Sequence, residues 1–102
     1  MRLILFFDLP VITKSERKAY SDFHKYLIKN GYIMLQFSVY CKIFNNIEAL
    51  ENHKKILKKN IPNSGHIRVM NVTEKQYVGI EIIIGGRSLQ EDKVNSDPLL
   101  IL

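Results

Sequence analysis

Near the start of this 102-residue chain, five consecutive residues, Leu3–Phe7, are apolar, and the run stops at Asp8-Leu9-Pro10. A continuous apolar run of this length is typical of a strand buried on both faces. Proline ends the strand because it cannot donate a hydrogen bond to a sheet ladder. The chain is therefore expected to begin with a core strand that ends at Asp8.

A helical pattern follows this strand. Thr13 and Glu16 match the capping box, in which a hydroxyl at the N-cap is followed three residues later by a glutamate, and Asn30-Gly31 suits a helix C-terminus. Between these ends the apolar residues repeat at helical spacing. They are Ala19, Tyr20, Phe23, Tyr26 and Leu27.

A second helix is expected after Asn45 or Asn46, either of which can act as its N-cap. Two pairs of apolar residues recur at a spacing of seven and are predicted to form its inner face. The pairs are Leu50 with Leu57 and Ala49 with Ile56, and the outer face and end carry Lys54, Lys55, Lys58 and Lys59.

Strand patterns fill most of the remaining chain. Residues 32–43 are apolar and β-branched and form either one long bent strand or two strands joined near Gln36-Phe37. Residues 66–72 alternate as a half-exposed strand does, and residues 77–84 are predicted to form another strand after a polar turn at 73–76. The chain ends in four aliphatic residues.

Helices interleaved with strands on one small sheet predict an α+β fold, a ferredoxin-like sandwich in which two helices cover one face of an antiparallel sheet. We expect a single domain over residues 1–102, with a core at 1–87, a loop at 88–96 and a C-terminal strand at 97–102. An exposed aliphatic terminus would promote aggregation, so this strand is expected to join a partner subunit in a homodimer.

Charge is distributed unevenly along the chain. The net charge is +5, and residues 1–59 hold 11 Lys and Arg against 5 Asp and Glu. A basic half favours a polyanionic partner such as nucleic acid, although a lysine-rich solvated surface would give the same count. The single cysteine excludes an intramolecular disulfide, and no apolar run is long enough for a signal peptide or a membrane span. We therefore expect a soluble cytoplasmic protein with no membrane partner.

Three segments in this order resemble one known family. They are Leu3–Pro10, Glu16–Tyr20 and Gln36–Tyr40, and they resemble CRISPR-associated protein two, the small core protein of spacer acquisition. The segment Val72–Gln76 is similar to the form found beside type II systems. The resemblance implies a ferredoxin-like homodimer that bridges copies of the CRISPR integrase protein and supports duplex DNA. Some members of the family are metal-dependent endonucleases on RNA or DNA, and the resemblance implies that the aspartate matching Asp8 is a divalent-metal ligand.

Asp8 fits this metal role only in part. Mg²⁺ is usually held by one or two carboxylates with waters and substrate phosphate, and no second acid lies near Asp8 in the sequence. A two-fold dimer would bring Asp8 and its symmetry mate together. The alternative is that Asp8 only terminates the strand before Pro10.

Lys14, Arg17 and Lys18 cluster where the first helix begins, and the helix dipole there also favours phosphate. We predict that these three residues contact nucleic acid, although solvated side chains would show the same pattern. The three histidines, His24, His53 and His66, show no metal-ligand spacing and are expected on a helix surface or at a strand edge. Cys41 is expected to be a core or half-buried residue.

Three functions remain open at this point. The leading hypothesis is a dimeric bridging subunit of the CRISPR adaptation complex that binds duplex DNA and the integrase. The second is a Mg²⁺-dependent endonuclease that cleaves RNA or DNA, with Asp8 as catalytic residue and metal ligand. The third is a dimeric ferredoxin-like regulatory or toxin-related domain.

Overall fold

The structure, a computed structural model, describes residues 1–88 and 90–91. The predicted C-terminal strand at 97–102 and most of the predicted loop at 88–96 lie outside the described residues. Within the described part, the elements in chain order are β1 (Arg2–Asp8), α1 (Lys14–Lys29), β2 (Ile33–Gln36), β3 (Val39–Ile43), α2 (Ile47–Leu57), β4 (His66–Val72) and α3 (Glu74–Val78).

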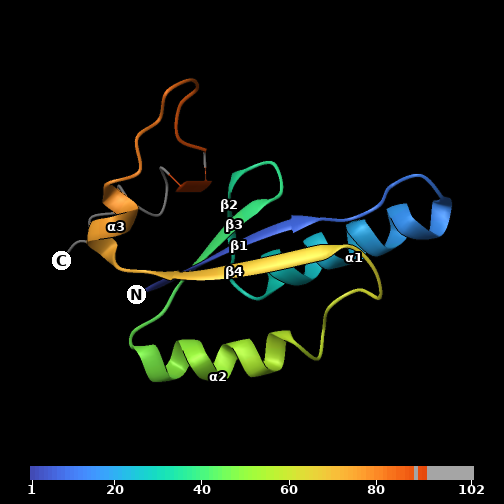
Figure 1. The fold of residues 1–102 in the computed structure, drawn as a ribbon, viewed down its shortest axis with the longest axis horizontal. Helices are drawn as coiled ribbons and strands as arrows, with labels where there is room; N and C mark the ends of the chain where they lie inside the picture. Colours follow the sequence, from blue (N-terminus) through green and yellow to red (C-terminus); the bar gives the residue numbers. More distant parts are fainter. Residues whose placement is uncertain (89, 92–102) are drawn as a thin grey trace.

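The strands form one antiparallel sheet in the order β2-β3-β1-β4 (Figure 1). β1 is central, because it pairs with β3 on one side and with β4 on the other. A helix follows β1 and another follows β3, so each connection returns the chain to the same sheet. This arrangement is the ferredoxin-like α+β fold that the order of elements predicts.

The two faces of β1 have different neighbours because successive side chains of a strand point to opposite sides. Leu3, Leu5 and Phe7 face the main core. They pack with residues from both helices, namely Phe23 and Leu27 of α1 and Leu50 and Leu57 of α2. The first two helices therefore cover one face of the sheet, and the alternate residues Ile4, Phe6 and Asp8 lie on the other, which we call the open face.

The helix starts follow the sequence signals closely. Thr13 Oγ1 accepts from the backbone N–H of Glu16 at 3.1 Å, and Glu16 Oε1 accepts from the N–H of Thr13 at 2.8 Å, so the predicted capping box is present. At α2 the cap is Asn46, whose Oδ1 accepts from Ala49 N at 2.8 Å. These caps satisfy backbone donors that have no partner within the helix.

The inner face of α2 is only partly as predicted. Leu50 and Leu57 are buried, but Ala49 is exposed and Ile56 is 56% exposed. A spacing of seven residues recurs on every face of a helix, so the repeat alone could not distinguish the two pairs. The half-buried His53, one turn after Leu50, completes the inner face instead.

Residues 32–43 form two strands, which resolves the alternative left open by the sequence. The chain turns at Phe37-Ser38, where Ser38 has a positive φ of 66°, and the register shifts between Met34 and Gln36. Serine can adopt this left-handed conformation, although it does so less often than glycine or asparagine.

The prediction of a strand at 77–84 is wrong. The chain forms α3 at Glu74–Val78, and residues 79–88 form neither helix nor strand. Thr73 and Gln76 make a second capping box, which starts a helix where a polar turn was expected. The aliphatic residues that follow have a strand-like sequence pattern, but they form no backbone pairing with any strand of the described chain.

Candidate functional site

Asp8 lies at the exposed end of β1, on the open face of the sheet. Its direct partner across the ladder is His66, the first residue of β4, which is also exposed. Directly opposite residues on one face of an antiparallel pair have Cβ atoms about 4.5–5.5 Å apart. The structure therefore places a carboxylate and an imidazole side by side at this end of the sheet, a pairing that the sequence spacing did not suggest.

The backbone around Asp8 is closely packed. Gly65, just before β4, has φ of +102°, and a Cβ on it would lie 2.7 Å from the carbonyl oxygen of Asp8 and 2.5 Å from Leu9 Cδ2. Only glycine allows this approach, so the loop before β4 fixes the position at which β1 ends.

The described residues do not provide a complete set of metal ligands around Asp8. No group of three His, Cys, Asp or Glu side chains suitable for a metal ion occurs among the described residues. A magnesium ion needs oxygen ligands in an octahedral arrangement, although waters and substrate can supply most of them. A single Asp8 thus fits the role of one ligand, and a second copy of the chain would add the matching carboxylate by symmetry.

The predicted phosphate-binding residues lie together on the exposed first turns of α1. Arg17 donates from Nη1 to the carbonyls of Ile12 at 2.7 Å and Val11 at 3.3 Å, and so holds the loop between β1 and α1. Lys18 donates to Asp22 at 2.9 Å, and Lys14 is exposed. Two of the three cations are therefore already engaged with the chain, through contacts that exposed groups exchange readily with solvent.

The open face itself is apolar and only partly covered. Ile4, Cys41 and Val72 are buried there against Tyr77 of α3, whereas Phe6 is 37% and Met70 is 49% exposed. Residues 80–87 pass over this face and leave a groove of about 880 Å³ between themselves and the sheet. The aliphatic residues of this segment are exposed as well, up to 93% for Ile84.

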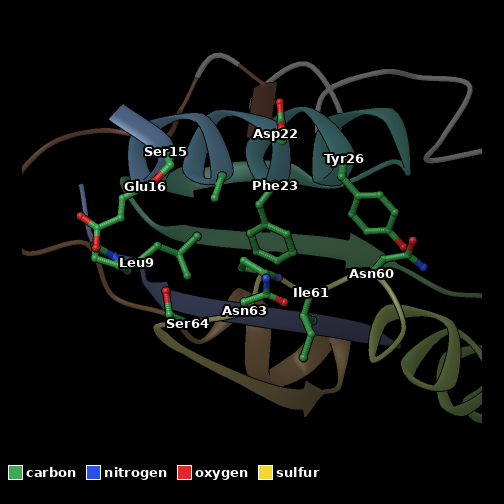
Figure 2. Close-up of a pocket in the computed structure, with 13 residues that line it drawn as sticks. Leu9, Ser15, Glu16, Asp22, Phe23, Tyr26, Asn60, Ile61, Asn63 and Ser64 are labelled. Carbon is green, nitrogen blue, oxygen red and sulfur yellow. The ribbon is translucent and has the colours of Figure 1, made fainter. Parts of the chain in front are cut away.

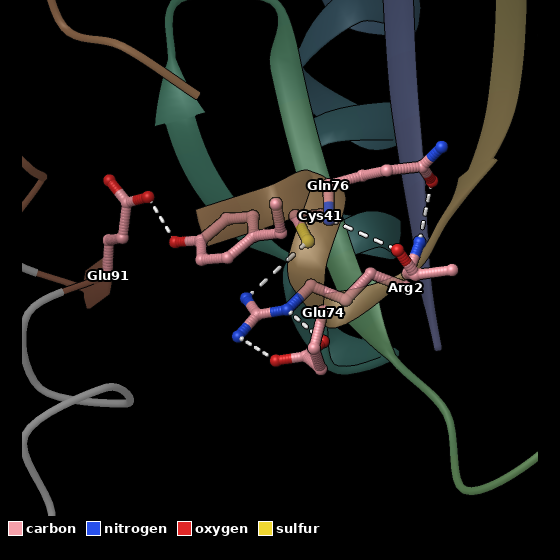
Figure 3. Close-up of polar contacts among 7 residues, drawn as sticks. Arg2, Cys41, Glu74, Gln76 and Glu91 are labelled. Carbon is pink, nitrogen blue, oxygen red and sulfur yellow. Dashed lines mark hydrogen bonds and ion pairs between the residues drawn. The ribbon is translucent and has the colours of Figure 1, made fainter. Parts of the chain in front are cut away.

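Arg2 anchors α3 to the open face, and sequence analysis did not single it out. Its Nε and Nη2 donate to the two carboxylate oxygens of Glu74 at 2.7 and 3.0 Å, and its guanidinium lies 3.6 Å from the centre of the Tyr77 ring (Figure 3). Nη1 also points at Cys41 Sγ, 3.9 Å away. The available signal was an arginine at the start of an otherwise apolar strand, since a charge at a buried position needs a partner.

The pKa values of this cluster follow from those contacts. The hydrogen bonds from Arg2 hold the pKa of Glu74 below its usual range, so this carboxylate stays ionised. Burial raises the pKa of the Cys41 thiol, which is the expected behaviour of a small core residue. The cluster is thus a structural anchor.

Two histidines that were expected on the surface are half-buried and hydrogen-bonded. His24 Nδ1 pairs with the hydroxyl of Tyr40, and His53 Nε2 pairs with the hydroxyl of Tyr32 at 2.7 Å. Burial lowers the pKa of His53, and the positive charge of the nearby Lys42 lowers it further. Both side chains extend the core, and neither belongs to a group of three potential metal ligands among the described residues.

The fold and this face define a class of protein: a small ferredoxin-like domain with a carboxylate at the end of its first strand and an apolar sheet face only partly covered. Residues 1–80 match the family model described as CRISPR associated protein Cas2. The chain therefore belongs to the Cas2 family, as its sequence resemblance implied.

Relatives named CRISPR-associated endoribonuclease Cas2 span nearly the whole chain. The protein from Treponema denticola is 48% identical over 102 residues, covering 100% of this chain and 99% of the relative. The one from Acidovorax ebreus is 45% identical over 96 residues, or 94% of each chain. The one from Streptococcus mutans UA159 is 44% identical over 101 residues, or 99% of this chain and 91% of the relative. No helix within the described residues is long and apolar enough to cross a membrane.

Proposed function

We propose that the chain is a homodimeric bridging subunit of the CRISPR spacer-integration complex, which holds duplex DNA and binds the integrase protein. The observation that carries the proposal is the open face. Phe6 and Met70 are exposed in its middle, and the aliphatic segment at 80–84 is exposed beside it. Monomeric proteins seldom leave an apolar surface of this kind uncovered, and a second copy would cover both parts by symmetry.

The surface charge supports a duplex as the other partner. Three of the cations of α1, Lys14, Arg17 and Lys18, lie at its start. α2 carries four lysines on its last turn and just beyond, Lys54, Lys55, Lys58 and Lys59. Contacts from such side chains to phosphate position a duplex without reading its sequence. Membership of the Cas2 family argues for this partner over the regulatory or toxin-related alternative.

Duplex binding is tested with the purified chain, alone and together with a CRISPR integrase protein from the same source. Affinity should fall steeply as salt rises, by roughly 10³-fold or more between about 50 and 200 mM if six or more phosphates are contacted. The triple variant Lys14→Ala, Arg17→Ala, Lys18→Ala should reduce both the affinity and this salt dependence. A matched variant that removes Lys55, Lys58 and Lys59 changes net charge equally. An equal loss in both variants would show that charge alone, and not the start of α1, determines binding.

The role of Asp8 separates this proposal from the nuclease alternative. A bridging subunit needs no reactive carboxylate, so Asp8→Ala should leave spacer acquisition in cells largely intact. Complete loss of acquisition by a correctly folded Asp8→Ala protein would overturn the bridging proposal in this form.

A second candidate function is a Mg²⁺-dependent endoribonuclease, which the names of the relatives favour. Asp8 would supply one carboxylate from each copy of a dimer, and the ion would activate water for attack on a phosphodiester. Cleavage of RNA by the purified chain should then require added Mg²⁺, stop with EDTA and disappear in Asp8→Asn. Cleavage that survives the Asp8→Asn substitution would exclude this function.

A further inference from the structure

A second groove lies on the side of the molecule covered by α1, away from the open face (Figure 2). One wall is α1, the other is the loop at residues 60–64, and the chain just after Asp8 closes one end. Its volume is about 490 Å³, which is large enough for a bulky side chain with part of its backbone. Leu9, Phe23 and Ile61 make its floor and inner walls apolar.

The groove is already formed in the free chain. Gly65 holds the end of the loop at 60–64 against the backbone of Asp8 and Leu9, in a contact that no other residue allows. Pro62 restricts the middle of the same loop. A partner that enters the groove would therefore not have to order its walls, and preorganisation of this kind favours binding.

The charge of the groove argues against nucleic acid. Among the described residues that line it there is no Lys, Arg or His, although the whole chain has a net charge of +5. Its lining includes Glu16 and Asp22. Asp22 already pairs with Lys18 of the same helix, so Glu16 is the carboxylate left for a partner's cation. The backbone N–H of Thr13 lowers the pKa of Glu16 and keeps it ionised, and only Oε1 of that carboxylate is engaged by backbone donors. A cation is favoured here and a phosphate backbone is disfavoured.

Polar groups on the loop wall are available to a polypeptide. The side chains of Asn63 and Ser64 line the groove and make no hydrogen bond with any described residue. An amide and a hydroxyl can pair with the backbone of an extended segment. Ile61 beside them is 47% exposed, so an apolar surface is also left uncovered.

We infer that this groove docks an extended protein segment that carries a large apolar side chain next to a lysine or arginine. The apolar side chain fills the space over Phe23, Leu9 and Ile61. The cation pairs with Glu16, and the segment's backbone bonds to Asn63 and Ser64. The inference rests on the proposed function, in which the integrase is the protein partner, and it assigns protein docking and DNA binding to different surfaces.

The test places an arginine in the groove and compares its effect with that of an arginine at an exposed alanine elsewhere. Ala19 lines the groove, whereas Ala49 is an exposed alanine on α2 that does not line it. Integrase binding, measured by calorimetry, should weaken at least tenfold in Ala19→Arg and stay within twofold of the unmodified chain in Ala49→Arg. Duplex DNA affinity should not fall in either variant. Circular dichroism and urea unfolding establish that both variants are folded.

A cross-linking experiment identifies the segment directly. Cys41 is buried, so among the described residues a new cysteine at an exposed position is the thiol that a reagent labels. Ile61 in the groove and Ile47 at the start of α2 are each 47% exposed and provide the two positions. A benzophenone attached to Ile61→Cys should cross-link to one integrase segment that contains an apolar residue beside a lysine or arginine. The same label on Ile47→Cys, at the opposite end of α2 from the loop at 60–64, should not reach that segment.

Each outcome bears on the inference. Unchanged integrase binding in Ala19→Arg overturns it and leaves the proposed function standing. A fall in duplex affinity in Ala19→Arg also overturns it, because the groove would then contact nucleic acid. If the unmodified chain binds no integrase at all, the proposed function fails and the inference fails with it.

Discussion

Arg2 shows how a buried charge is made tolerable in a chain of this size. Its side chain is 5% exposed, and removing a guanidinium from water is costly unless its donors find partners. Glu74 accepts two of these donors, and the Tyr77 ring covers the guanidinium face. Because both partners belong to α3, the contact that satisfies Arg2 also fixes this helix on the open face.

Removal of the Glu74 side chain should therefore lower the free energy of unfolding more than removal of an acidic side chain from an exposed ion pair. We expect Glu74→Ala to lower the free energy of unfolding by about 1–2 kcal/mol, because it leaves a buried cation without its acceptor, although Glu74 itself is half exposed. Asp22→Ala breaks the exposed pair with Lys18 and should cost less than about 0.5 kcal/mol. Urea unfolding at neutral pH compares the two, and equal losses would contradict the anchoring role.

His53 should make stability depend on pH. Burial and Lys42 lower its pKa in the folded chain, so the unfolded chain binds the proton more readily. The contribution of neutral His53 to the free energy of unfolding should be fully present above the unfolded pKa of about 6.5 and should decline as pH falls below it. The urea midpoint of the unsubstituted chain should drop between about pH 7 and pH 5, and this drop should be smaller in His53→Gln, which can keep a hydrogen bond to Tyr32. Identical pH profiles would refute this explanation.

The loop between α2 and β4 depends on Gly65, and Gly85 offers a control with the same kind of backbone. Both have positive φ, +102° and +98°, but a Cβ on Gly85 would meet no atom within 4 Å. We expect Gly85→Ala to cost about 1–2 kcal/mol, from backbone strain alone. Gly65→Ala adds overlap with Asp8 and Leu9 and should cost about 2–4 kcal/mol. Thermal unfolding measures both, and similar losses would indicate that the loop can move away from β1.

Elements whose signals are local could be predicted from the sequence. The Thr13 capping box, the Asn46 cap and the apolar run of β1 are all where they were expected. The second capping box at Thr73 and Gln76 is equally local, but the strand-like aliphatic pattern after it obscured it. A segment with a strand-like pattern forms a strand only where another strand is available to pair with it. The sequence of the segment itself does not show whether such a strand is available.

The candidate site was harder to predict from the sequence because it is assembled from distant parts of the chain. Asp8 could be picked out by its place at a strand end, and it does lie there. Its neighbour His66 depends on the register of β1 with β4, and the pairing of Arg2 with Glu74 joins residues 72 positions apart. The groove beside α1 requires the packing of a loop on a helix, which no local pattern specifies.

At the scale of the molecule, three surfaces differ in chemistry and can act without competing. The open face is apolar, the start of α1 and the end of α2 are basic, and the groove between α1 and the loop at 60–64 has acidic residues in its lining. A subunit that bridges several partners needs separate sites of this kind. A dimer would present each basic surface and each groove twice, related by a two-fold axis.

The dimer itself can be tested by placing a charge in the open face. Met70 lies opposite Ile4 in the ladder and is 49% exposed in the single chain, so Met70→Lys should fold, yet it would bury two uncompensated cations in a two-fold interface. We expect this variant to sediment as a monomer at concentrations where the unsubstituted chain is dimeric, and to lose integrase bridging while each copy still binds DNA. Ile56→Lys, at a residue 56% exposed on α2, should leave the dimer unchanged. If Met70→Lys remains dimeric, the two copies do not meet through the open face, and the exposed aliphatic segment at 80–84 must be covered in another way.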